Sequence, residues 1–244
     1  MCRNPFYIKE FEFHAPCGTC EYCLQKRTSD WAMRMHHEYL SSKRKACFVT
    51  LTYSPKCLPL VLDSNKVPRE TLFKKDVQNY FKRLRNNVDK KIRYYAAGEY
   101  GSKGNRPHYH LCIFGLTPDA WKDASGFVYL ENKDTCDIGF DSVWKMGIVS
   151  VSHDFGVEAG AYAAKYATKV IRAKGFSYAP RIPPFQLQSL GIGKEYALKN
   201  GDDIKKNSTS HNQATKNQYP ATTKNSLTSP TKIIKTLSKK KMNF

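Results

Sequence analysis

The sequence predicts an α+β fold in which helices pack on a central, mostly antiparallel sheet. Three observations support this prediction. The expected elements follow the order strand, helix, strand, strand, helix, strand, helix. The two middle strands flank a short turn with two glycines at 101–105, which is typical of a hairpin. The helix expected over 71–88 has one apolar side and one basic side, as a helix lying on a sheet should have.

The first elements follow from composition and from hydrophobic periodicity. Residues 24–45 contain no Gly or Pro and are rich in strong helix formers, so they predict a basic helix. Residues 46–53 form an apolar run that ends at Ser54-Pro55, which indicates a buried strand. The amphipathic helix over 71–88 follows a loop.

The second half of the sheet is predicted from two hairpin strands and one later strand. Residues 92–100 and 106–115 predict the hairpin strands. Thr117 and Pro118 have the residue types expected at the cap and first position of a short helix. The segment 144–152 predicts a strand with Ile148, Val149 and Val151 as its core, and 157–174 is an alanine-rich helix.

Charge and length limit the class of protein. The chain has 244 residues, of which 40 are Lys or Arg and 21 are Asp or Glu, giving a formal charge of +19 and a pI near 9.6. Such an excess of positive charge predicts a nucleic-acid partner. No apolar run approaches the roughly 18 residues of a spanning helix, and the N-terminus lacks a secretory signal, so we expect no membrane association and a cytoplasmic location.

The chain divides into four expected regions. We expect a cysteine-rich candidate zinc segment plus basic helix at 1–45, the main domain at 46–175, an extension at 176–199 and a basic, disordered tail at 200–244. No Asp or Glu follows Asp203. The tail either adds affinity for nucleic acid or is simply solvated.

Two histidines carry the clearest chemical signal. His108 and His110 flank one residue on an expected strand, so their side chains lie on one face. Glu99 on the partner hairpin strand can lie beside them. Two imidazoles and one carboxylate suit a divalent cation such as Mg²⁺ or Mn²⁺ that also binds substrate oxygens. The alternative is a strand with two half-buried histidines in ordinary hydrogen bonds.

Two tyrosines form the second signal. Tyr162 and Tyr166 are four residues apart on an expected helix, so they share one face, and Lys165 lies close to Tyr162. A phenol that is activated by a cation can attack a phosphodiester and hold the product covalently. The alternative is core packing on an alanine-rich helix.

The N-terminal cysteines predict a structural zinc site, with reduced thiols on a loop as the alternative. The four candidate ligands are Cys2, Cys17, Cys20 and Cys23. Cys47 and Cys112 lie in apolar strands and are expected in the core. Cys57 and Cys136 are expected in loops and have no assigned role.

Basic and aromatic side chains are candidate contacts for single-stranded DNA, with solvated cations and core aromatics as the alternatives. The basic candidates are Arg83, Arg85, Arg93, Lys103, Arg106 and Lys145. The aromatic candidates for base stacking are Tyr94, Tyr95, Tyr100 and Tyr109.

Residues 48–53, 108–110 and 162–166, in this order, resemble the three motifs of the HUH endonuclease superfamily in its two-tyrosine form. Together with the early Cys-x-x-Cys-x-x-Cys and the segment 144–147, they are similar to replication initiators of microviruses, especially the gokushovirus type. The resemblance covers roughly 1–175.

The resemblance implies a metal-dependent enzyme that nicks one DNA strand at a replication origin, forms a 5′-phosphotyrosine link and rejoins the strand in rolling-circle replication. Tyr162 and Tyr166 would be the nucleophiles, and Lys165 would assist at the phosphate or the metal. His108 and His110 would be ligands, with Glu99 as the third. The implied fold is akin to an RNA-recognition domain, and the implied location is the cytoplasm of an infected bacterium.

Two other functions fit parts of the sequence. A zinc-stapled single-strand DNA-binding protein without catalysis would explain the charge, the aromatics and the tail. An HUH transposase or relaxase shares the metal motif, although the second tyrosine argues against a single-tyrosine transposase. The chain has no phosphate-binding Gly-rich loop with Lys-Ser/Thr, so a host helicase is a candidate partner for unwinding.

Overall fold

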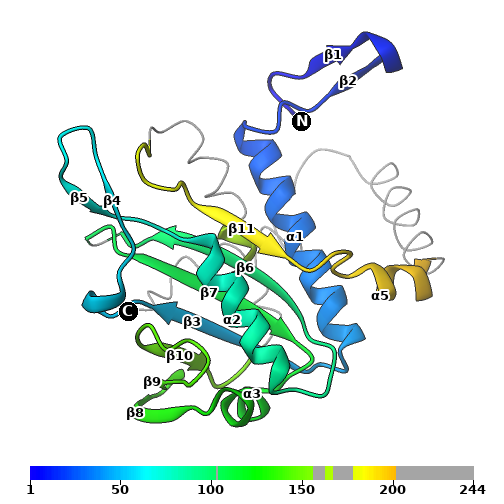
Figure 1. Cartoon of the computed structure of the whole chain (residues 1–244). Coiled ribbons are helices and arrows are strands. Elements are labelled where there is room, and N and C mark those ends of the chain that lie inside the picture. The colour runs from blue at the N-terminus through cyan, green and yellow to red at the C-terminus, as the bar shows by residue number, and fades with distance from the viewer. Residues whose placement is uncertain (103, 156–162, 167–177, 202–244) are drawn as a thin grey trace, which may run out of the picture.

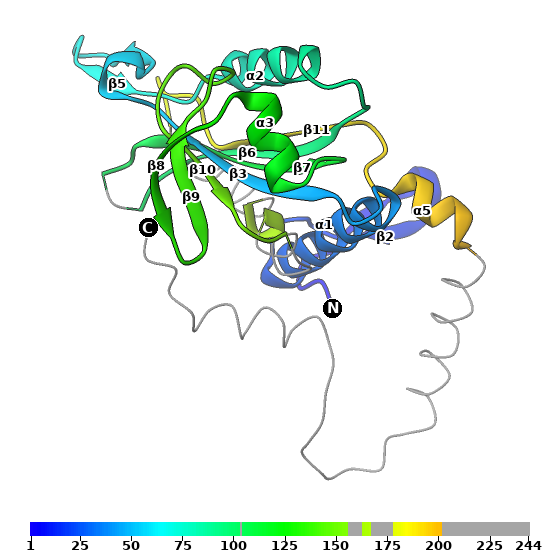
Figure 2. The same ribbon diagram turned by 90° about the horizontal axis from the view of Figure 1, so that it is seen from below.

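A computed structural model describes residues 1–102, 104–155, 163–166 and 178–201. It confirms the α+β class: a seven-stranded antiparallel sheet carries helices on both faces (Figures 1 and 2). In Figure 2 the sheet lies between α2 and α3 on one side and α1 on the other.

The elements alternate between the two faces of this sheet. The bounds are β1 (Phe6–Ile8), β2 (Phe13–Ala15), α1 (Glu21–Ser41), β3 (Ala46–Thr52), β4 (Leu60–Leu62), β5 (Pro68–Glu70), α2 (Lys74–Asn86), β6 (Arg93–Tyr100), β7 (Pro107–Phe114), α3 (Pro118–Ser125), β8 (Val128–Lys133), β9 (Cys136–Phe140), β10 (Val149–Ser152), β11 (Phe185–Gln188) and α5 (Lys194–Lys199), with single 3₁₀ turns at Lys9–Phe11 and Pro55–Cys57.

The strand order in the main sheet is β11-β6-β7-β3-β10-β9-β8. The expected hairpin is confirmed, because β6 pairs antiparallel with β7 around the short turn. The expected cap of α3 is also confirmed: the Thr117 side chain accepts a hydrogen bond from the Ala120 N–H, and Pro118 is at the first turn. Strand β11 pairs with β6, so residues after 178 supply an edge strand to the main sheet.

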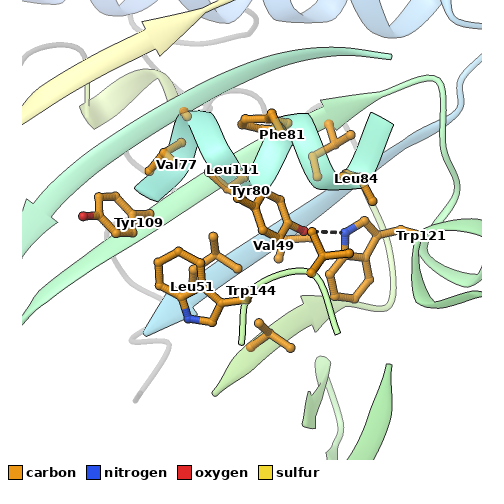
Figure 3. Close-up of a cluster of buried hydrophobic side chains, with 14 of the residues drawn as sticks. Val49, Leu51, Val77, Tyr80, Phe81, Leu84, Tyr109, Leu111, Trp121 and Trp144 are labelled. Carbon is orange, nitrogen blue, oxygen red and sulfur yellow. Dashed lines mark hydrogen bonds between the residues drawn. The ribbon is translucent and has the colours of Figure 1, made fainter. Parts of the chain in front are cut away.

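The larger core lies between the sheet and α2 (Figure 3). The apolar side of α2 contributes Tyr80, Phe81 and Leu84, which are all buried. Trp121 of α3 donates its indole N–H to the Tyr80 hydroxyl at 2.8 Å, shown as the dashed line in Figure 3. This bond satisfies two polar groups that would be costly to bury alone.

A second core lies between the opposite sheet face and α1, with Met35 of α1 fully buried in it. Glu38 of α1 is also buried. Its carboxylate pairs with the Arg93 guanidinium at 2.8 Å and accepts the Gly193 N–H at 2.8 Å. These contacts fix α1, β6 and the start of α5 together, so the face that carries the histidines has a rigid cover.

Two details of the expected elements were wrong. The strand expected over 144–152 is limited to β10, and Ile148 precedes it with 42% of its surface exposed, because the alternation of β10 turns Val149 and Val151 inward. Cys136 is not in a loop: it begins β9 and is buried.

Several sequence expectations fall outside the described residues. These include most of the helix expected at 157–174, although residues 163–166 are helical, and the tail after 201. The four-region division of the chain stays a prediction. None of the helices in the described parts of the chain has both the length and the apolar character needed to span a lipid bilayer.

Candidate metal and tyrosine site

The histidine pair and the glutamate lie on the face of the sheet that α1 covers. In the antiparallel register, Glu99 of β6 is directly opposite His108 of β7. On the other side of β7, Thr52 of β3 is opposite His108 and Thr50 is opposite His110. Because side chains alternate along a strand, all five point to one face. The sequence prediction that Glu99 lies beside the two histidines is therefore consistent with the structure.

The candidate ligand atoms converge on one point. The Nε2 atoms of His108 and His110 lie 3.1 Å and 3.3 Å from the same Glu99 Oε1, and the three ligand atoms lie within 4.8 Å of one another. A cation that is about 2.1 Å from each of two ligands at right angles would separate them by about 3.0 Å. Glu99 is only 7% exposed, so its charge is held in a partly desolvated place. The residues present fit a divalent cation.

Neighbouring groups orient both imidazole rings. The Nδ1 of His108 lies 3.1 Å from the backbone oxygen of Arg106, which can only accept, so the hydrogen is on Nδ1 and the lone pair is on Nε2. The Nδ1 of His110 lies 3.0 Å from the Thr50 hydroxyl, which can accept in the same way. This is the arrangement that metal-binding histidines use in proteins. Thr50 had no assigned role from the sequence, and its position in the alternating 48–53 strand is the signal that could have found it.

The tyrosine motif meets the histidine motif through Tyr166. The Tyr166 ring is stacked on His110, with the ring centroids 4.5 Å apart and the planes 15° apart, and only 4% of the residue is exposed. Lys165 is half-buried in the same helical segment. Tyr162 lies outside the described residues. Two motifs about fifty residues apart in the sequence therefore share one site.

Strand β7 is also anchored on its other face. The Tyr109 side chain, between the two histidines in sequence, points away from them into the α2 core. Its hydroxyl lies 2.8 Å from the Tyr53 hydroxyl and accepts the Phe73 N–H at 2.9 Å, and Tyr53 donates to Asp76 of α2 at 2.5 Å. Burial raises the pKa of Tyr109 to about 12, so this network is uncharged at its tyrosines near neutral pH. The network fixes the strand that carries the histidines.

The four N-terminal cysteines come together at the start of α1. The Sγ distances are 3.5 Å for Cys20–Cys23, 3.9 Å for Cys20–Cys2 and 4.0 Å for Cys17–Cys23. Four sulfurs at about 2.3 Å from a tetrahedral zinc ion are about 3.8 Å apart, so the cluster fits zinc.

Backbone donors prepare one of these thiols for a cation. Hydrogen bonds from the backbone N–H groups of Thr19 and Cys20 lower the pKa of Cys17 to about 6, which favours the thiolate that a metal requires. Burial acts in the opposite direction on Cys23 and raises its pKa to about 12. A cation at the centre would offset that cost.

The predicted DNA contacts lie in different places. Arg106 is two residues from His108, and its guanidinium donates to the Tyr53 carbonyl at 2.7 Å. Arg83 donates to the Val143 carbonyl at 2.7 Å, and Arg85 lies over the Phe81 ring, so both belong to the α2 face, opposite the histidines. Lys103 lies outside the described residues.

The remaining basic and aromatic candidates are mostly structural in the fold. Arg93 is paired with Glu38, as described above, and Lys145 is exposed in the loop before β10. Tyr95 and Tyr109 are buried in the two cores, whereas Tyr100 is only half-buried.

Comparisons with known proteins identify relatives among bacteriophage proteins. A family model for replication-associated proteins of the ORF2 type matches residues 46–171. The chain is 31% identical over 200 residues to replication-associated protein ORF2 of Spiroplasma virus 4, and 32% identical over 172 residues to replication-associated protein ORF4 of Chlamydia phage 1. It is 28% identical over 168 residues to replication-associated protein VP4 of Bdellovibrio phage phiMH2K.

These alignments cover 78%, 66% and 64% of this chain, but only 59%, 40% and 49% of the respective relatives. No solved structure matches the chain. The region that the family model matches contains residues 48–53, 108–110 and 162–166, the three motifs singled out in the sequence.

Proposed function

The chain belongs to the family of ORF2-type replication-associated proteins, and on this basis we propose that it initiates replication of a small single-stranded DNA phage by nicking one strand at the origin. The observation that carries the proposal is the shared location of Glu99, His108, His110 and Tyr166. A binding protein without catalysis has no need for a tyrosine stacked beside a candidate metal site.

The proposed reaction is a transesterification at phosphorus. The hydroxyl of Tyr162 or Tyr166 loses its proton and attacks the scissile phosphodiester, so a bond forms between the phenol oxygen and phosphorus while the bond to the 3′ oxygen breaks. The departing 3′ oxygen takes up a proton, and the 5′ phosphate stays on the tyrosine. Attack by a 3′-hydroxyl on the phosphotyrosine reverses these steps and rejoins the strand.

The charged side chains have separate roles in this proposal. Glu99, His108 and His110 would hold a divalent cation such as Mg²⁺ or Mn²⁺. When bound, such an ion polarises a phosphoryl oxygen and orients the phosphate. Lys165 would place a positive charge beside the tyrosines. Arg106 is the first candidate for a contact to the DNA backbone near the site, with Arg83, Arg85 and Lys103 as more distant candidates.

The cysteine cluster has a structural role in this proposal. The β1–β2 hairpin has only three residues in each strand, too few to form a core of its own. A zinc ion held by the four cysteines would attach the hairpin to the start of α1. We further propose that the protein acts on its DNA in the cytoplasm of the infected bacterium, and a host helicase as partner stays a prediction.

The test is a denaturing gel of the full chain incubated with Mn²⁺ and end-labelled single-stranded DNA of the phage genome. We expect a label that stays linked to the protein. The link should be lost in the Tyr162→Phe, Tyr166→Phe double variant, which keeps both rings, and in the His108→Ala, His110→Ala double variant.

Two outcomes would contradict the proposal. A label linked equally well in the double phenylalanine variant would exclude the tyrosines as nucleophiles. DNA that is retarded on a native gel, with no denaturant-stable adduct under any divalent metal, would favour the non-catalytic binding protein. Cleavage confined to transposon ends would instead favour a transposase.

A further inference from the structure

A polar groove of about 840 Å³ lies at the end of the sheet where β6 turns into β7. The β4–β5 hairpin forms one wall, with Asp63 and Arg69. The turn residues Gly104 and Asn105 and the segment 178–181 complete the lining. Figure 1 shows the β4–β5 hairpin beside the turn that joins β6 to β7. Neither the sequence motifs nor the proposed chemistry uses this groove.

The wall at 178–181 presents a prearranged stacking surface. The Tyr178 ring is stacked on Tyr100, with centroids 5.8 Å apart and planes 17° apart, and the Arg181 guanidinium lies 4.5 Å from the Tyr100 ring centroid. The Tyr100 hydroxyl donates to the Ile182 carbonyl at 2.6 Å, and the Ile182 N–H donates to Thr71 at 2.8 Å. Tyr178 and Arg181 are half-buried, so each still presents surface to the groove.

The charges of the groove favour bases over phosphates. Among the described lining residues, Arg69 and Arg181 are balanced by Asp63 and Glu70, and Arg69 is already paired with Asp63 at 2.9 Å. A phosphate-binding channel would instead carry an excess of positive charge. A planar base fits a wall made of an aromatic ring and a guanidinium, with polar groups opposite to accept and donate hydrogen bonds.

The groove lies close to the candidate metal site. Tyr100 directly follows Glu99, and Asn105 is three residues before His108 on the other strand of the hairpin. Three residues of extended chain span about 10 Å. A DNA strand with its scissile phosphate at Glu99 and the histidines therefore has this groove within a short reach.

We propose that this groove binds unpaired bases of a single DNA strand next to the scissile phosphate, with Tyr178 and Arg181 as the stacking wall. The inference rests on the proposed function, because it names a second contact of the same substrate. Base contacts here would add selectivity to the non-selective attraction that comes from the charge of +19.

The test is photocrosslinking with a 20-nucleotide, mixed-sequence single strand that carries 5-iodouracil at its thymine positions. The Tyr162→Phe, Tyr166→Phe double variant is used, so that binding is measured in a protein without the proposed nucleophiles and a failure of nicking cannot mimic a failure of binding. We expect a crosslink at Tyr178, found by mass spectrometry in the tryptic peptide that ends at Arg181. This arm needs no substitution in the groove.

A second arm measures affinity by fluorescence anisotropy. Tyr178→Ala should weaken binding of the same strand at least five-fold and leave the slope of affinity against salt concentration unchanged, because a stacking contact is lost and no phosphate contact is. The controls are Tyr129→Ala, an exposed tyrosine on β8 at the far edge of the sheet, and Lys90→Ala, an exposed cation. Crosslinks that avoid Tyr178, an affinity equal to that of the controls, or a changed salt slope would each overturn the inference.

Discussion

Replacing Thr50 with valine should weaken metal binding without removing a ligand. The Thr50 hydroxyl lies 3.0 Å from His110 Nδ1, and this hydrogen bond orients the ring with its Nε2 toward Glu99. Valine keeps the branched shape and the strand preference, so only the hydrogen bond is lost. Loss of such an outer partner typically weakens metal binding 10- to 100-fold, or about 1.4–2.8 kcal/mol.

Calorimetric titration of the full chain with Mn²⁺ measures this effect, and Thr52→Val provides a matched control. Thr52 is on the same strand and the same face, but its hydroxyl donates to the Ile148 carbonyl at 2.8 Å and not to a histidine. We expect the control to bind Mn²⁺ as the unsubstituted protein does. Equal affinities for Thr50→Val and Thr52→Val would refute the reasoning.

Three further predictions concern the supporting structure. Tyr109→Phe leaves the buried Phe73 N–H without its acceptor, so we expect a loss of about 1–3 kcal/mol in the free energy of unfolding, measured by urea denaturation. Burial raises the pKa of Asp141 from 3.8 to about 6, so its contribution to stability is present below pH 4 and is lost as the pH rises through 6. Asp141→Asn does not titrate, and its stability relative to the unsubstituted protein should rise by roughly 3 kcal/mol between pH 4 and pH 7, whereas a constant difference would exclude Asp141 as the source. Elemental analysis should find one zinc per chain in the unsubstituted protein and less in Cys20→Ser, while equal zinc in both would exclude the cysteine site.

Much of the fold could be predicted because its central elements have strong local patterns. The helix α2 has a regular apolar side, and β3, β6 and β7 are buried runs bounded by turn residues. The hairpin turn then sets the register that brings Glu99 to His108. Strand β8 was missed because all six of its residues are exposed, so it shows no alternation. Strand β11 was missed because its pairing with β6 joins segments about ninety residues apart, and no local pattern records such a partner.

The candidate site was predictable to the extent that it lies within one hairpin. The His108–Glu99 contact follows from strand alternation and a short turn. The Thr50 contact needs the pairing of β3 with β7 across sixty residues, and the Tyr166 stack on His110 needs the packing of a helix on the sheet. Neither follows from periodicity, and only the family resemblance indicated that the tyrosine and histidine motifs act together.

The most direct test of the central claim is mass spectrometry of the covalent product. The full chain is incubated with Mn²⁺ and a single-stranded DNA that it nicks, the DNA is digested to a short remnant, and the modified residue is identified. The account predicts a nucleotide linked through phosphorus to Tyr162 or Tyr166. A nucleotide linked to any other side chain, or DNA cleaved with no protein-linked product, would contradict it.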